Sequence, residues 1–197
     1  MDSNITAIES DIVMGNEENE NNEVSPIVQP IMAHPPQYLS DLTFDTFIEM
    51  ATTGLDSKDF QHKHLKLDFK EIATVGPALE SLHQAFCRKD GTFDQTVFLN
   101  ADILKGPGKR YGTLEMEADL FIERCLGFAQ RSEKNRRQCA FSLGWRVDCR
   151  SLGGYTTHDV NQMREVIEKH NLLEQSAGEI VISHSLTHFH KFRRFFA

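Results

Sequence analysis

Charged side chains that could bind a cation or a phosphate alternate with apolar ones in Leu65–Lys70. Because strand side chains alternate between two faces, this pattern places Lys66, Asp68 and Lys70 together on one face of a strand. Helix-like sequence lies on both sides of the stretch, which favours a covered strand of a parallel sheet. Charges on a covered face are costly unless they are paired or bind something. The stretch is therefore either a buried cluster of ion pairs or one wall of a site.

Neighbouring segments carry polar groups at corresponding places. Glu9 and Asp11 share one face of the first predicted strand, and Asn100 and Asp102 share one face of a later strand. His34 ends a short apolar run, and two prolines fix the chain just beyond it. Sites in parallel sheets form at the carboxyl ends of the strands. We expect these side chains to converge at that end of the sheet.

The carboxylates admit two interpretations. Glu9, Asp11 and Asp68 either bind a divalent metal ion or form an internal cluster of ion pairs with Lys66 and Lys70. Hard divalent cations prefer carboxylate oxygens, whereas mixed charges on one face also suit internal pairing. The sequence leaves both readings open.

Each of the remaining candidate residues also has more than one interpretation. His34 is either a turn residue or a functional group at a strand end. Asn100 and Asp102 either cap the following turn or hydrogen-bond a ligand. Trp145, in a further predicted strand, suits the core or a pocket wall better than a specific ligand contact.

Strand-like and helix-like segments alternate at roughly thirty to forty residues, as βα units require. About six strands are predicted, whereas a closed (β/α)8 barrel has eight strands and about 250 residues. We therefore expect an α/β fold in one domain over residues 1–197, either an incomplete barrel or an open sheet. The acidic, low-complexity run at residues 15–24 is expected to be a solvated loop.

Composition excludes several classes of function. The chain has 197 residues, of which 40% are hydrophobic and 25% charged, as in ordinary soluble proteins. Its formal net charge of -8 argues against a nucleic-acid partner. No apolar run is long enough for a membrane-spanning helix, and Met1–Asn4 lacks the basic start and apolar core expected of a signal peptide.

Five segments together resemble the menorin-like domain family. They run over nearly the whole chain and occur in the order of the family's motifs. These segments are Pro30–Pro36, Leu65–Lys70, Leu99–Pro107, Ser142–Trp145 and Gly154–Thr156.

The resemblance implies a TIM barrel related to the glycerophosphodiester phosphodiesterases and phospholipase-C-like phosphodiesterases. On that likeness, Glu9 and Asp11 match a Glu-x-Asp metal pair, and His34 matches a general acid or base. Asp68 matches a further metal carboxylate, and Lys70 matches a catalytic lysine that holds the phosphate.

The resemblance also implies how a ligand would be held. Lys66, Asn100, Asp102 and Trp145 are the expected substrate-binding residues. The expected cofactor is Ca²⁺ or Mg²⁺, with no organic cofactor. The expected partners are cell-surface proteins or a phosphodiester ligand.

The sequence also departs from the related enzymes. The first barrel strand, with its catalytic histidine, and the last two βα units are expected to be missing from this chain. We therefore expect a partial barrel with little or no catalysis. The resemblance places it in the extracellular space, and the alternative is the cytoplasm. The alternative function is a divalent-metal-dependent phosphoric diester hydrolase acting on glycerophosphodiester-like substrates.

Overall fold

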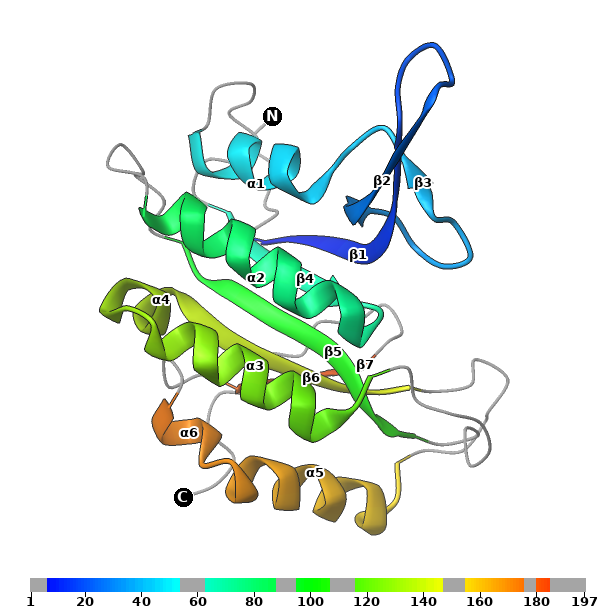
Figure 1. Ribbon diagram of the computed structural model, residues 1–197. Helices are drawn as coiled ribbons and strands as arrows, with labels where there is room; N and C mark the ends of the chain where they lie inside the picture. The colour runs from blue at the N-terminus through cyan, green and yellow to red at the C-terminus, as the bar shows by residue number, and fades with distance from the viewer. Residues whose placement is uncertain are drawn as a thin grey trace, which may run out of the picture.

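The computed structural model describes residues 7–53, 63–87, 95–106, 116–146, 155–175 and 180–184. Over these residues the chain is a mixed α/β fold built on one sheet (Figure 1). The strands are β1 (Ala7–Glu18), β2 (Val24–Met32), β3 (Leu39–Ser40), β4 (His64–Phe69), β5 (Val97–Lys105), β6 (Cys139–Arg146) and β7 (Ile180–His184). The helices are α1 (Phe44–Thr53), α2 (Ile72–Cys87), α3 (Ala118–Gln130), α4 (Glu133–Gln138), α5 (Thr157–Lys169) and α6 (Leu172–Gln175).

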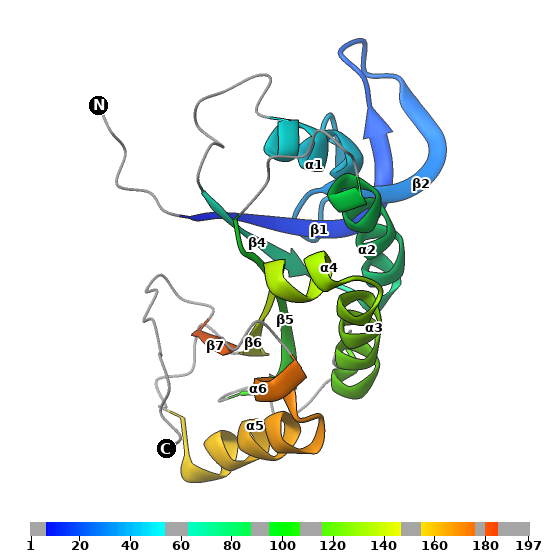
Figure 2. The ribbon, with the colours of Figure 1, turned by 90° about the vertical axis from the view of Figure 1, so that its left-hand side faces the viewer.

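The strand order is β2-β1-β4-β5-β6-β7, with β3 paired to β1. Strands β1, β4, β5, β6 and β7 are parallel and lie side by side in chain order, whereas β2 runs antiparallel to β1. Figure 2 shows helices α2 and α3 along the same side of these strands. Within the described residues the sheet is open, with β2 and β7 at its two ends.

One face of the sheet is apolar and packs against the helices. Leu65, Leu67 and Phe69 of β4 are no more than 1% exposed and belong to a single hydrophobic cluster with residues of α1, α2, α3 and α5. The predicted alternation in β4 is therefore confirmed. Because side chains alternate, the charged residues of β4 lie on the opposite face.

The prediction of a solvated loop at residues 15–24 was wrong at its two ends, whereas residues 19–23 lie outside the strands and are exposed as predicted. Strand β1 continues to Glu18, and β2 begins at Val24. Asn16 pairs with Val28 of β2 on one side and with Leu39 of β3 on the other. Strand pairing satisfies the backbone near Asn16, while Glu20 and Glu23 are exposed in the connection between β1 and β2. Acidic composition alone therefore did not exclude a hairpin.

Gly15 provides a test of this ribbon, because a Cβ there would clash with the Tyr38 carbonyl and the Ile31 side chain. We expect Gly15→Ala to lower the free energy of unfolding by about 1–3 kcal/mol in urea denaturation. The matched control is Gly127→Ala in α3, where nothing lies within 4 Å of the added Cβ. That change should stabilise the protein by about 0.5–1 kcal/mol. Equal effects of the two substitutions would contradict the hairpin packing.

Candidate functional site

Four polar side chains form one row across the face of the sheet opposite the hydrophobic core. In the strand register, Asp11 is the partner of Asp68, Asp68 of Asn100, and Asn100 of Ser142. Partners on adjacent strands point to the same face, so β1, β4, β5 and β6 each contribute one member. The structure thus brings together three residues that the sequence nominated and adds Ser142. Its polar character within an otherwise apolar strand was the signal for it.

Lys70 is the ion-pair centre of this row. Its Nζ lies 2.9 Å from Oδ1 of Asp11 and 2.6 Å from Oδ2 of Asp68. The backbone N–H of Lys70 donates to the Ile12 carbonyl at 3.1 Å, which fixes the start of its side chain beside β1. One ammonium therefore neutralises carboxylates from two neighbouring strands.

A second ion pair lies one row nearer the amino ends of the strands. Nζ of Lys66 is 2.8 Å from Oε1 of Glu9. The Lys66 side chain is only 9% exposed, whereas Glu9 is 44% exposed. Lys66 of β4 and Lys70 just beyond its end are thus paired with carboxylates of β1 and β4, as the ion-pair interpretation of the sequence proposed.

The electrostatics of the central pair keep the proton on the lysine. Burial lowers the pKa of Lys70, but Asp68 and Asp11 outweigh it and the net pKa is raised. Burial raises the pKa of Asp68, and the neighbouring Lys70 and the Asn100 amide offset only part of that effect. Because the Lys70 pKa rises from a far higher starting value, the pair is an ammonium and a carboxylate at neutral pH.

Hydrogen bonds extend the row to the next two strands. Oγ of Ser142 donates to Oδ1 of Asn100 at 2.7 Å, and both side chains are buried. The Asn100 amide in turn hydrogen-bonds Asp68. The orientation of the Asp68 carboxylate is thus held from β5 and β6 as well as by Lys70.

Asp102 lies one step further along β5, in register with Gly144. Burial, with a contribution from Asp68, raises the pKa of Asp102 to about 6, and Lys70, Lys66 and Arg146 oppose the shift. Asp102 is therefore the carboxyl of this face whose charge changes near neutral pH.

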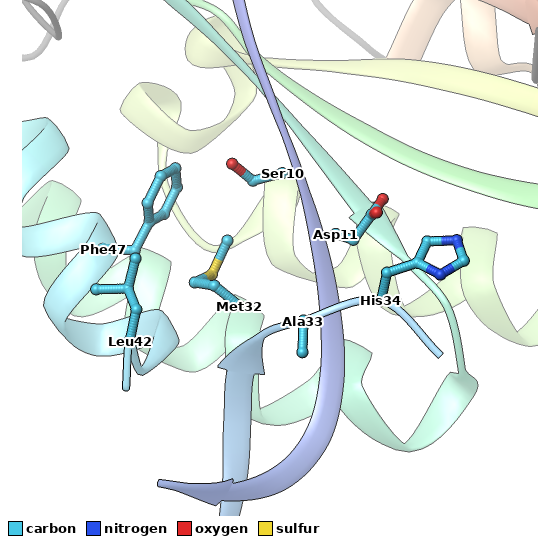
Figure 3. Close-up of a pocket in the computed structure, with 7 residues that line it drawn as sticks. All are labelled: Ser10, Asp11, Met32, Ala33, His34, Leu42 and Phe47. Carbon is cyan, nitrogen blue, oxygen red and sulfur yellow. The ribbon is translucent and has the colours of Figure 1, made fainter. Parts of the chain in front are cut away.

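His34 lies beside Asp11 in a pocket at the outer edge of β1, which Ser10, Met32, Ala33, Leu42 and Phe47 also line. In Figure 3, the Asp11 carboxylate and the His34 ring point to one side of β1, and Leu42 and Phe47 lie on the other. Nδ1 of His34 donates to the Pro35 carbonyl at 2.6 Å, since a carbonyl oxygen only accepts. This bond leaves Nε2 as the ring nitrogen available to a ligand.

Trp145, nominated as a substrate contact, is set apart from the polar row. It alternates with Gly144 along β6, so its side chain lies on the core face. It is 3% exposed, belongs to the hydrophobic cluster, and its ring centroid lies 4.8 Å from that of Tyr155.

The carboxylates expected to hold Ca²⁺ or Mg²⁺ do not fit that role as they are arranged. Glu9 is bound to Lys66, and Lys70 bridges Asp11 and Asp68. In the part of the chain that the structure describes, no group of three or more His, Cys, Asp or Glu side chains is placed to hold a metal ion. The resident partner of these carboxylates is an ammonium.

Comparison with known proteins confirms the expected family. Residues 1–186 match the Menorin N-terminal domain. The chain belongs to the Menorin N-terminal domain family. It is 32% identical to human Protein FAM151B over 138 residues, which is 70% of this chain and 41% of that protein. The chain thus spans about two fifths of the length of this relative. No solved structure matches. No helix in the described ranges is long and apolar enough to cross a membrane.

The raised pKa of Asp102 predicts how stability depends on pH. Its carboxylate costs free energy in the folded state above about pH 6, and protonation relieves that cost between pH 6 and the ordinary value of 3.8. We expect Asp102→Asn to raise the free energy of unfolding by about 1–2 kcal/mol at pH 8 and to have little effect below pH 4. Urea denaturation across this range measures the difference. A difference that does not change with pH would contradict the prediction.

Proposed function

We propose that this chain is a non-catalytic binding domain of the menorin family, acting in the extracellular space on a cell-surface protein. The observation that carries this proposal is the pairing of Lys70 with Asp11 and Asp68. In this pairing, the carboxylates that would bind a metal ion and the lysine that would hold a phosphate bind one another instead. The same holds for Lys66, which Glu9 binds at 2.8 Å. A polar face neutralised in this way suits hydrogen bonding to a protein partner better than capture of a phosphate.

We also propose that the domain is part of a (β/α)8 barrel of the phosphodiesterase type. Strand order supports this, because five parallel strands follow one another without the reversal of order that marks a doubly wound sheet. Helices pack on a single face of the sheet, and the polar row lies on the other. Pairing of β1 with β2 begins at Ile12, so residues 7–11 have no strand partner on that side among the described residues. A further strand would fit there.

The alternative function is a divalent-metal-dependent phosphodiesterase. It draws support from His34, which lines the same pocket as Asp11 and keeps Nε2 available for proton transfer. Hydrolysis of glycerophosphocholine in the presence of Mg²⁺ or Ca²⁺ distinguishes the two functions. We expect no turnover by this chain or by its His34→Ala variant. Turnover that His34→Ala abolishes would overturn the non-catalytic proposal.

The proposed partner class is tested by binding of the fluorescently labelled chain to intact cultured cells. We expect saturable binding that is lost when the cells are first treated with trypsin, because the partner is a protein. The control is Gly127→Ala, which changes a position in α3 away from the polar row and should bind as the wild type does. Binding that survives trypsin would point to a lipid phosphodiester and contradict the protein partner.

A further inference from the structure

The ammonium of Lys70 occupies the point where the carboxylates of two strands meet. Its Nζ lies 2.9 Å from Asp11 Oδ1 and 2.6 Å from Asp68 Oδ2. Calcium and magnesium lie about 2.0–2.6 Å from their oxygen ligands. A divalent ion shared by these two carboxylates would therefore take nearly the position of the lysine nitrogen. The two cations exclude each other by both size and charge.

Several contacts hold Lys70 and its partners in this arrangement. The backbone N–H of Lys70 is bonded to the Ile12 carbonyl at 3.1 Å, so the side chain starts beside the strand that carries Asp11. Asn100 hydrogen-bonds Asp68, and buried Ser142 donates to Asn100. The side chains of Lys70 and Asp68 are only 22% and 13% exposed. Low exposure strengthens the pairing, because water screens it less.

We infer that Lys70 is a tethered cation that keeps divalent metal ions out of the site formed by Asp11 and Asp68. The inference rests on the proposed function, because it takes the polar face as the site. It adds to that function the group that neutralises the carboxylates of this face, which is the Lys70 ammonium. The presence or absence of the Lys70 ammonium would therefore determine whether this face is an ion-pair network or a potential metal site. With the ammonium present the face is a closed ion-pair network. Without it, two adjacent carboxylates would remain, and Mg²⁺ sites are commonly built from one or two carboxylates and water.

Lys66 of β4 supplies a matched comparison. Its Nζ is 2.8 Å from Oε1 of Glu9. Removing Lys66 unpairs Glu9, which is half-exposed and whose register partner on β4 is Lys66 itself rather than a second carboxylate. Removal of Lys70 should therefore create a metal site, whereas removal of Lys66 should not.

The experiment is calorimetric titration of the whole chain with CaCl₂ and, separately, MgCl₂, with the metal-dependent shift of the thermal melting temperature as a second readout. We expect no saturable binding to the wild type, to Lys70→Arg or to Lys66→Ala. We expect Lys70→Ala to gain saturable binding at least about tenfold tighter than any wild-type signal, because the competing charge is gone. Adding Asp11→Asn to Lys70→Ala should remove the gain.

Lys70→Gln serves as a second variant that keeps most of the side-chain bulk if Lys70→Ala does not fold. The inference is overturned if folded Lys70→Ala and Lys70→Gln bind no metal. It is equally overturned if the wild type binds Ca²⁺ or Mg²⁺ saturably and Asp11→Asn abolishes that binding. These results are independent of the hydrolysis and cell-binding tests, since metal binding is measured without substrate or partner.

Discussion

The structure of the polar face depends on one ammonium shared by two carboxylates from neighbouring strands. Asp11 and Asp68 are direct partners in the register of β1 and β4, so their like charges are forced together by the backbone pairing. Lys70, two residues beyond Asp68 and just past the end of β4, supplies the charge that makes this juxtaposition tolerable. Removing one partner of such a pair leaves an uncompensated charge with little access to water, which destabilises the folded state.

The rest of the domain follows from the need to keep two chemically different faces apart. The apolar face of β4 packs into one cluster with helices α1, α2, α3, α5 and α6, and that burial provides the main stabilisation. The opposite face places charges and amides in rows that the strand register sets. Asn100 and Ser142 extend the central row into the buried part of the sheet, where a hydrogen bond satisfies both side chains. Asp102 is partly buried on the same strand as Asn100, and both burial and the charge of Asp68 raise its pKa.

Local sequence pattern predicted much of this arrangement. The alternation in Leu65–Lys70 correctly assigned β4 and the face of each side chain. The same reasoning brought Asp11, Asp68 and Asn100 to one face of the sheet. The local pattern could not predict which side chains pair with one another. Pairing of Lys70 with two carboxylates depends on the register between strands far apart in sequence, which local alternation does not determine.

The misses also have physical causes. The acidic stretch was assigned to a loop by composition, yet the strand pairing of β1 with β2 and β3 extends into it at both ends. The sequence analysis did not predict helix α4, because it spans only Glu133–Gln138. Its start depends on a local cap, in which the Ser132 side chain accepts a hydrogen bond from the Asn135 N–H. The sequence left Trp145 between the core, a pocket wall and a ligand contact, and its place in the alternation of β6 puts it in the hydrophobic cluster.

The central claim is that Lys70 and Asp68 stabilise one another across an internally neutralised face. A double-mutant cycle measures this most directly, from the unfolding free energies of the wild type, Lys70→Met, Asp68→Asn and the double variant. The account predicts a favourable coupling of about 1–3 kcal/mol, with the double variant more stable than the sum of the single losses implies. A coupling near zero would contradict the claim, because Lys70 and Asp68 would then contribute to the free energy of unfolding independently of one another.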